Sequence, residues 1–154
     1  ELETIIANAA KKLKVKVDRQ SIKEIAKRAR GTPRVALKLL KRARDYAQVK
    51  SKGDIDKVNI AQALDLLGVD PFGLDGLDRR YLKNIIEKHG GGPVGVETIA
   101  ASISEDVGTV EEVVEPYLLQ LGFIKRTKSG RVATKGAFEH LGKKFTKENQ
   151  QKLL

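Results

Sequence analysis

The 154-residue chain contains no cysteine, no methionine and no tryptophan. The lack of cysteine excludes a disulfide framework and a thiolate metal site, and it fits a reducing compartment, so we expect a cytoplasmic protein. No run of about 18 apolar residues is present, and no signal-peptide pattern is recognisable, so we expect no membrane association. Acidic residues are too few to balance the basic ones, and the net charge of +10 favours an anionic partner.

The positive charge is concentrated at the two ends of the chain. Residues 1–70 carry a net charge of +8, residues 71–115 carry −5, and residues 116–154 carry +7. A basic end piece therefore follows an acidic stretch. This distribution indicates where nucleic acid could dock, although a charge run by itself is equally typical of a solvated face.

The first 70 residues have the periodicity of amphipathic helices. Apolar side chains recur at helical spacing in four segments, namely residues 1–13, 22–29, 33–50 and 55–67. Glycine or short polar stretches separate the segments. The pattern predicts a compact helical unit that ends near Gly68, and Pro71 marks the expected domain boundary because proline disfavours helix at the residue before it.

The segment from Arg28 to Arg34 marks the end of one helix and the start of the next. Gly31 suits the left-handed position that closes a helix, Thr32 can cap the following helix through its hydroxyl, and Pro33 fits the first helical turn. Arg34 is then predicted to lie in a first turn, where free N–H groups already attract anions. We interpret Arg34 as a residue that grips an anion; the alternative is a solvated arginine.

The second half of the chain follows a different pattern. The expected elements are a helix over 74–88, a short strand at 94–96, a helix over 97–103, a helix from a capping box at 109–112 to 121, a hairpin over 123–134 and a last helix over 135–141. Pro116 should bend the helix that contains it. This order of elements is typical of a winged helix-turn-helix.

The predicted hairpin is strongly basic. It carries, with no acidic residue between them, Lys125, Arg126, Lys128, Arg131 and Lys135. A two-stranded wing projects such side chains toward a phosphate backbone, so the hairpin is the predicted DNA contact. The alternative is a charged hairpin edge that only prevents aggregation. In either case we expect exposed hairpin charges to contribute little to folding stability.

The helix before the hairpin is acidic. It carries Glu111, Glu112 and Glu115, whose carboxylates would repel phosphates, so we expect the wing to contact the DNA backbone rather than this helix to read bases. We interpret the three glutamates as a solvated helix face. No residue pattern points to catalysis or to metal binding, because His89 and His140 each stand apart from any second ligand.

Several motifs together resemble the RuvB family of AAA+ ATPases, the bacterial Holliday-junction branch-migration motor. The motifs are Arg28 to Arg34, Gly91-Gly-Pro-Val-Gly95, Glu115-Pro-Tyr-Leu-Leu-Gln120, Gly122-Phe-Ile-Lys-Arg-Thr127 and Gly130-Arg-Val-Ala-Thr134. The resemblance covers residues 1 to about 142 and implies a mainly α fold. Residues 1–70 would form a four-helix AAA+ lid domain and residues 74–142 a winged-helix domain with a small β-hairpin wing, whereas residues 143–154 are expected to be a basic, disordered tail.

The resemblance also implies roles for individual residues. Arg34 corresponds to the sensor 2 arginine, which contacts ATP phosphate from the lid, and Arg126 and Arg131 correspond to two wing arginines associated with DNA binding. The family's wing usually reads Arg-Thr-Pro-Arg-Gly-Arg, but this chain has Lys128 in place of the proline and a serine in place of the middle arginine. Lys125 and Lys128 are weaker candidates for DNA contact.

The intact family protein is a homohexameric, ATP-hydrolysing DNA helicase or translocase of recombination and repair. The resemblance implies ATP and Mg²⁺ as cofactors, duplex and four-way-junction DNA as ligands, and a junction-binding partner protein. The P-loop ATPase core is not in this segment, so we expect no ATP hydrolysis by the segment alone and no catalytic residue or metal ligand in it. The alternative function is a winged-helix transcription regulator with a helical dimerisation domain.

Overall fold

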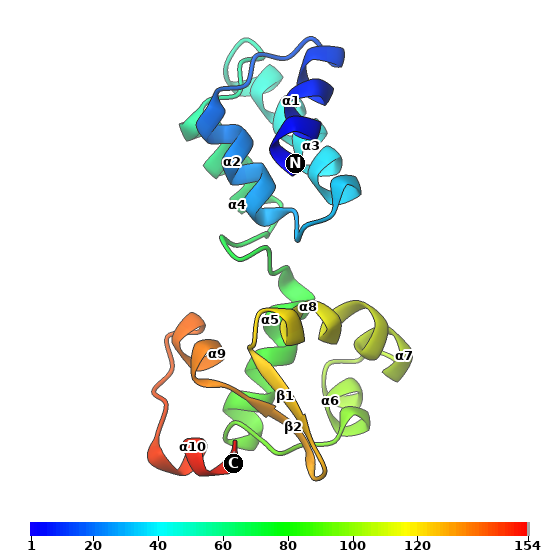
Figure 1. Ribbon diagram of the computed structural model, residues 1–154, viewed down its shortest axis with the longest axis vertical. Coiled ribbons are helices and arrows are strands. Elements are labelled where there is room, and N and C mark those ends of the chain that lie inside the picture. The colour runs from blue at the N-terminus through cyan, green and yellow to red at the C-terminus, as the bar shows by residue number, and fades with distance from the viewer. Residues whose placement is uncertain (154) are drawn as a thin grey trace. The chain divides into compact units, whose positions relative to one another are not determined.

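The computed structural model describes residues 1–153, and the chain folds as two compact units, Glu1–Gly76 and Leu77–Leu154 (Figure 1). The predicted boundary near Pro71 lies a few residues earlier. Asp70 explains the difference, because its carboxylate accepts the N–H groups of Phe72 and Leu74 at 2.9 and 3.0 Å and closes a turn that stays with the first unit. Across residues 1–153, no helix combines the length and the apolar character that crossing a bilayer requires.

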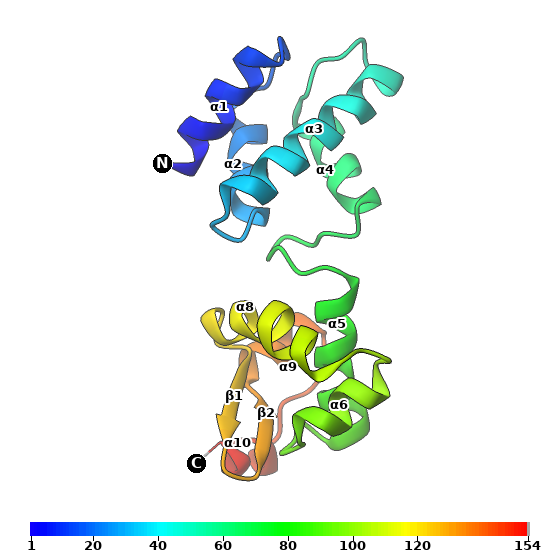
Figure 2. The ribbon, with the colours of Figure 1, turned by 90° about the vertical axis from the view of Figure 1, so that its right-hand side faces the viewer.

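The first unit consists of helices. They are α1 (Leu2–Lys12), α2 (Arg19–Arg28), α3 (Pro33–Lys50) and α4 (Lys57–Leu66). The long helix α3 packs against both α1 and α4 (Figure 2). The four apolar faces meet in one core, whose fully buried members include Ile6, Ile25, Leu40, Ile60 and Leu64. The four predicted helices are thus confirmed.

The second unit has the order of elements of a winged helix. Its elements are α5 (Gly76–Lys83), the π-helical η1 (Asn84–Lys88), α6 (Val96–Ser102), α7 (Val107–Thr109), the π-helical η2 (Val110–Val114), α8 (Glu115–Gln120), β1 (Ile124–Thr127), β2 (Gly130–Ala133), α9 (Lys135–His140) and α10 (Lys147–Lys152). The hairpin β1–β2 projects as an elongated ribbon in Figures 1 and 2. This architecture confirms the predicted mainly α fold with a small wing.

The helix before the wing differs from the prediction at its start and around its proline. It begins at Val107 rather than at a capping box at Thr109, because the Asp106 carboxylate caps it by accepting the Thr109 N–H at 3.1 Å. Pro116 is preceded by the wider π-helical turn η2. Since proline lacks an N–H and crowds the carbonyl four residues earlier, a wider turn lets the helix pass this residue.

The wing is a two-stranded antiparallel sheet. Its register pairs Ile124 with Ala133, Lys125 with Val132, Arg126 with Arg131 and Thr127 with Gly130. The strand predicted at residues 94–96 is only a single bridge, in which the backbones of Val94 and Arg131 exchange hydrogen bonds of 3.0 and 2.7 Å. Because Gly95 already caps α6, one residue is left to pair with β2.

The C-terminal segment is folded where disorder was predicted. Within its described part, residues 143–153, the Phe145 ring packs edge-on against Phe138 with centroids 5.2 Å apart. The Asn149 side chain donates to the Gly90 carbonyl at 2.7 Å. The prediction from composition is wrong here because specific partners hold the segment, one of them 59 residues away in the chain, and average polarity carries no sign of such partners.

Candidate nucleic-acid interface

A fully buried carboxylate lies beneath the wing. Glu115, the first residue of α8, has 0% exposure. Its carboxylate accepts hydrogen bonds from the Tyr81 hydroxyl at 2.7 Å, from Arg126 Nη2 at 2.8 Å and from Arg131 Nε at 2.9 Å. Arg131 Nη2 donates to the same carboxylate at 3.2 Å. Donors from α5, β1 and β2 thus converge on one interior charge, which is the condition under which a buried carboxylate is tolerated.

The hydrogen bonds keep this cluster ionised. Burial by itself raises the pKa of Glu115, but the hydrogen bonds from Arg131, Tyr81 and Arg126 together outweigh it and hold the pKa below its usual value. The hydrogen bond to Glu115 raises the pKa of Arg131. Burial, and then the contact with Glu115, raises the pKa of Tyr81. At neutral pH Glu115 is therefore an ionised carboxylate and Tyr81 a neutral phenol.

The two arginines differ in exposure. The side chain of Arg126 is 49% exposed and that of Arg131 is 17% exposed, and the two residues lie opposite each other in the hairpin register. Arg131 also lies 3.5 Å from a carboxylate oxygen of Glu111. No described residue accepts a hydrogen bond from Arg126 Nε, Arg126 Nη1 or Arg131 Nη1. Each guanidinium therefore retains donors for an external anion.

These contacts correct two expectations from the sequence. Glu115 is not part of a solvated face, although Glu111 and Glu112 are exposed. Nor is Arg131 a free hairpin charge, because it neutralises an interior carboxylate. A signal for Glu115 was present in the sequence: it lies directly after Val114 and one turn before Leu118, both of which are buried, so it falls on the apolar side of its helix.

The lysines of the wing strands and their turn are free, whereas Lys135, just after the wing, lies 3.8 Å from a carboxylate oxygen of Glu139. Lys125 and Lys128 are exposed, and neither forms an ion pair with any residue from 1 to 153. The hairpin tip is closed by the Thr127 hydroxyl, which donates to the Gly130 carbonyl at 2.7 Å. Gly130 has φ +133, and a Cβ there would lie 2.6 Å from the Val94 backbone. The close approach of β2 to Val94 thus requires glycine at this position.

Arg34 lies at the start of α3, which has an open N-terminus. Gly31 adopts the predicted left-handed conformation with φ 69. Thr32 occupies the N-cap position, but its side chain does not cap the helix as predicted; its hydroxyl is 3.3 Å from the Arg30 carbonyl instead. The first-turn N–H groups of α3 are therefore without a side-chain partner next to the exposed Arg34. Such a helix start favours an anion.

Further cations surround Arg34 on α3. A shallow hollow along this helix is lined by Arg34, Leu37, Lys38, Lys41, Arg42, Arg44 and Asp45. Asp45 is paired with Arg44 at 2.9 Å, whereas Lys38, Lys41 and Arg42 have no ion-pair partner in the described chain. The hollow therefore has an excess of positive charge, which suits a phosphate-bearing ligand.

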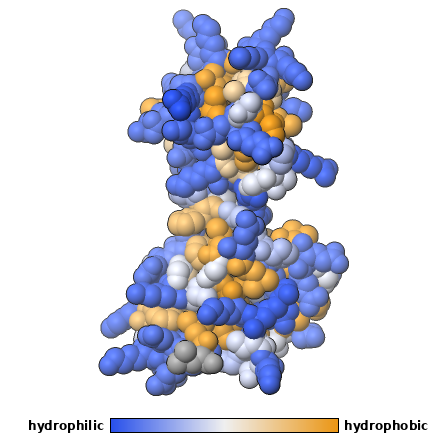
Figure 3. Space-filling model, viewed as in Figure 1, coloured by the Kyte–Doolittle hydropathy of each residue, from blue (hydrophilic) through white to orange (hydrophobic). Residues whose placement is uncertain are grey.

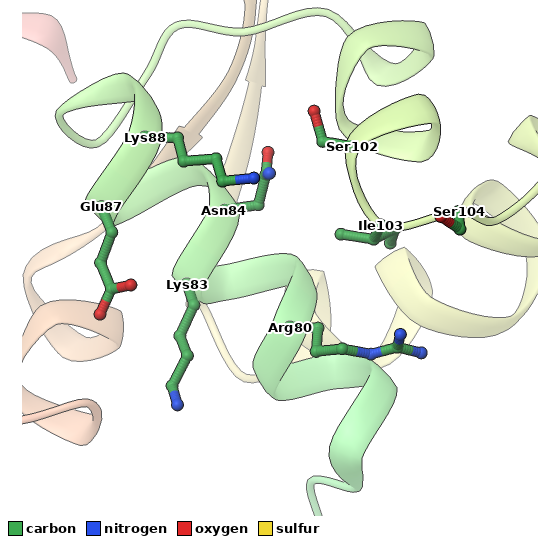
Figure 4. Close-up of a pocket in the computed structure, with 8 residues that line it drawn as sticks. All are labelled: Arg80, Lys83, Asn84, Glu87, Lys88, Ser102, Ile103 and Ser104. Atoms are coloured by element: carbon green, nitrogen blue, oxygen red, sulfur yellow. The ribbon is translucent and has the colours of Figure 1, made fainter.

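Another hollow lies between η1 and the end of α6 (Figure 4). In this view the Asn84 and Lys88 side chains extend toward Ser102, whereas Lys83 and Glu87 point away from it. Glu87 pairs with Lys143 at 3.0 Å. This hollow contains none of the predicted site residues. Nowhere in residues 1–153 do three or more His, Cys, Asp or Glu side chains gather in a way that could hold a metal ion.

The described surface is mostly hydrophilic on the face shown in Figure 3. Its exposed large apolar side chains are Val49, Val58, Leu66, Leu67, Phe72 and Val113. Charged side chains, rather than apolar ones, therefore provide the candidate ligand contacts of both units.

Known proteins resemble both units. The RuvB AAA lid domain matches residues 1–70, and the RuvB C-terminal winged helix domain matches residues 71–142. The Holliday junction branch migration complex subunit RuvB of Nostoc sp. is 54% identical over 151 residues, covering 98% of this chain and 41% of that protein. The subunit from Fusobacterium nucleatum is 52% identical over 143 residues, covering 93% of this chain and 43% of that protein.

Solved structures agree with these matches. The Thermotoga maritima RuvB Holliday junction branch migration motor has a TM-score of 0.90 and 43% sequence identity, covering 95% of this chain and 49% of that one. The chain thus spans less than half the length of the relatives it matches. Since the two family models together account for residues 1–142, the chain belongs to the RuvB family and contains its AAA lid domain followed by its C-terminal winged helix domain.

Proposed function

We propose that this chain is the DNA-binding and nucleotide-sensing part of an ATP-driven Holliday-junction branch-migration motor, a DNA helicase or translocase of recombination and repair. The observation that carries the proposal is the pair Arg126 and Arg131, which lie opposite each other on the wing and keep guanidinium donors that no described residue uses. The relatives of this chain are named as subunits of the Holliday junction branch migration complex. The parent protein would act in the cytoplasm as a homohexamer together with a junction-binding partner.

The wing would grip the DNA backbone without reading the sequence. Guanidinium groups match phosphate oxygens through forked donors, and phosphates are present on every duplex. The exposed Glu111 and Glu112 lie on the neighbouring helix, where they oppose insertion of that helix into a groove. Lys125 and Lys128 would add weaker, more mobile phosphate contacts. The same wing would serve duplex and four-way-junction DNA.

The lid would sense ATP through Arg34. An exposed arginine beside uncapped first-turn N–H groups, in a hollow with three unpaired cations, fits a nucleotide phosphate. The rest of the ATP site, including the ligands of Mg²⁺, would come from an ATPase core outside this chain, since the residues from 1 to 153 offer no carboxylate cluster for the ion. Bound ATP would supply the energy for movement, and Arg34 would hold its phosphate from the lid side.

Salt dependence tests the proposed DNA contact. On duplex DNA, each phosphate contact releases about one counterion, so replacing Arg126 or Arg131 by alanine should flatten the plot of log K against log salt by about 0.9. Affinity should fall equally on unrelated sequences and on a four-way junction, as measured by fluorescence anisotropy. Arg80→Ala is the matched control, because it removes an exposed, unpaired arginine outside the wing.

Two results would refute this proposal. If the double variant Arg126→Ala/Arg131→Ala keeps the wild-type affinity and salt slope on both DNA forms, the wing is not the DNA contact. If the chain instead protects one palindromic DNA sequence specifically, the alternative function, a winged-helix transcription regulator, is correct. The family matches favour the motor.

A further inference from the structure

We infer that Glu115 is a positioning residue for DNA binding: it holds the guanidinium groups of Arg126 and Arg131 in one arrangement before DNA arrives, and Tyr81 holds Glu115. This inference rests on the proposed function of the wing as the DNA contact. Glu115 itself is fully buried, so it touches no DNA and acts only through the two arginines.

The geometry of the carboxylate carries the inference. Its oxygen Oε2 accepts from Arg126 Nη2 at 2.8 Å and from Arg131 Nη2 at 3.2 Å, so the two guanidinium groups share one oxygen. Its other oxygen, Oε1, accepts from Arg131 Nε at 2.9 Å and from the Tyr81 hydroxyl at 2.7 Å. Both oxygens are therefore occupied, and the carboxylate cannot rotate without breaking hydrogen bonds in an interior that excludes water.

Fixed arginines bind phosphate with a smaller entropy loss. A free arginine has many rotamers and loses them on binding, so ordering two such side chains would weaken binding by about tenfold or more. In this fold the ordering has already taken place. The remaining donors of Arg126 and Arg131 leave the cluster from opposite strands of the hairpin, which suits a single phosphate or two adjacent ones.

The charge of Glu115 acts in the opposite direction. The Glu115 carboxylate repels phosphate, but the guanidinium groups of Arg126 and Arg131 pair with it and lie between it and the DNA, so they neutralise most of its field, and salt screens the remainder. Preorganisation is therefore the larger effect. Removing the charge of Glu115 should weaken DNA binding, even though it makes the wing more positive.

The test compares two glutamate-to-glutamine substitutions on the same helical stretch. Glu115→Gln and Glu112→Gln each remove one negative charge with little change in shape, but Glu112 is exposed and has no arginine partner in the described chain. Anisotropy with a labelled duplex should show about fivefold weaker binding for Glu115→Gln and equal or up to about twofold tighter binding for Glu112→Gln. A purely electrostatic role would move both variants in the same direction.

A double-mutant comparison separates positioning from general structure. In an Arg126→Ala/Arg131→Ala background, Glu115→Gln should cause no further loss of affinity, because there is nothing left to position. Tyr81→Phe keeps the buried ring and removes only the donor to Glu115, so it should weaken binding by about twofold. Tyr46→Phe in the other unit removes a hydroxyl that donates to Gln62 at 2.9 Å and should leave DNA binding unchanged.

The outcomes distinguish the inference from the proposed function. Wild-type affinity in the double arginine variant would refute the wing as DNA contact. If the double arginine variant loses DNA binding but Glu115→Gln binds DNA as tightly as wild type or more tightly, the wing remains the DNA contact and the positioning role of Glu115 is refuted. If Glu115→Gln lowers the helical circular-dichroism signal, Tyr81→Phe decides: unchanged affinity in that variant would overturn the inference.

Discussion

Arg126 and Arg131 lie directly opposite each other on β1 and β2 and donate to the same carboxylate oxygen, Oε2 of Glu115, at 2.8 and 3.2 Å. Two like charges in such a position would repel each other in an ordinary hairpin. The buried carboxylate between them removes this repulsion and joins the wing to α8. The same contact therefore serves folding and the proposed binding of DNA.

The two arginines should differ in their effect on stability. Arg131→Ala removes two of the four hydrogen bonds to a buried carboxylate and should destabilise the winged-helix unit by about 2 to 4 kcal/mol. Arg126 is more exposed and contributes one hydrogen bond, so Arg126→Ala should cost about 1 kcal/mol. Urea unfolding followed by circular dichroism measures both, and Lys128→Ala should cost nothing measurable. Equal losses for the two arginines would contradict this division.

Acid should destabilise the winged-helix unit through Glu115. The folded-state pKa of Glu115 is depressed, so its contribution is fully present above the unfolded-state pKa of about 4.3 and is lost as the pH falls through the folded-state value. The urea midpoint should therefore be flat near neutral pH and fall on acidification. Glu115→Gln should reduce the acid-induced fall relative to wild type. A parallel pH dependence in both proteins would show that Glu115 does not contribute.

Gly130 at the wing tip should be required because a Cβ there would collide with the Val94 backbone, and not only because its φ is positive. Gly130→Ala places a Cβ 2.6 Å from the Val94 backbone, which forces β2 away from that bridge. Gly122 also has a positive φ, of 73, but a Cβ there meets nothing within 4 Å. We expect Gly122→Ala to cost about 1 to 2 kcal/mol and Gly130→Ala clearly more, in thermal or urea unfolding. A smaller effect at Gly130 would refute this account of the tip.

The chain by itself should not hydrolyse ATP. Arg34 is proposed to complete a phosphate site whose remaining parts lie in an ATPase core, and the described residues contain no group of three or more metal-ligating side chains for Mg²⁺. Phosphate release by the purified chain above a no-protein control would disprove this. In a longer parent with an ATPase core, Arg34→Ala should reduce ATP-dependent DNA movement strongly, because the exposed side chain supports no part of the lid core. The control is Lys50→Ala, which removes an exposed lysine of the same helix outside the hollow around Arg34.

The local pattern of the sequence was sufficient for most of the fold. Helical periodicity predicted α1 to α4, and turn residues predicted the β1–β2 hairpin, because amphipathic spacing and turn chemistry act between near neighbours. The order of elements then indicated the winged helix. The basic hairpin and the arginine at the start of α3 were also visible as candidates, since residue type and helix position are properties of the sequence itself.

Tertiary structure decided what the charges do. Tyr81, Glu115 and Arg131 lie far apart in the chain, and only the packing of α5, α8 and the wing brings them together. From polarity alone, Glu115 was predicted to be solvated and the C-terminal segment to be disordered. Both predictions were wrong because composition indicates average solvation and does not identify the specific partners of a side chain. A buried charge is stable only with its partners in place, and those partners are selected by the fold.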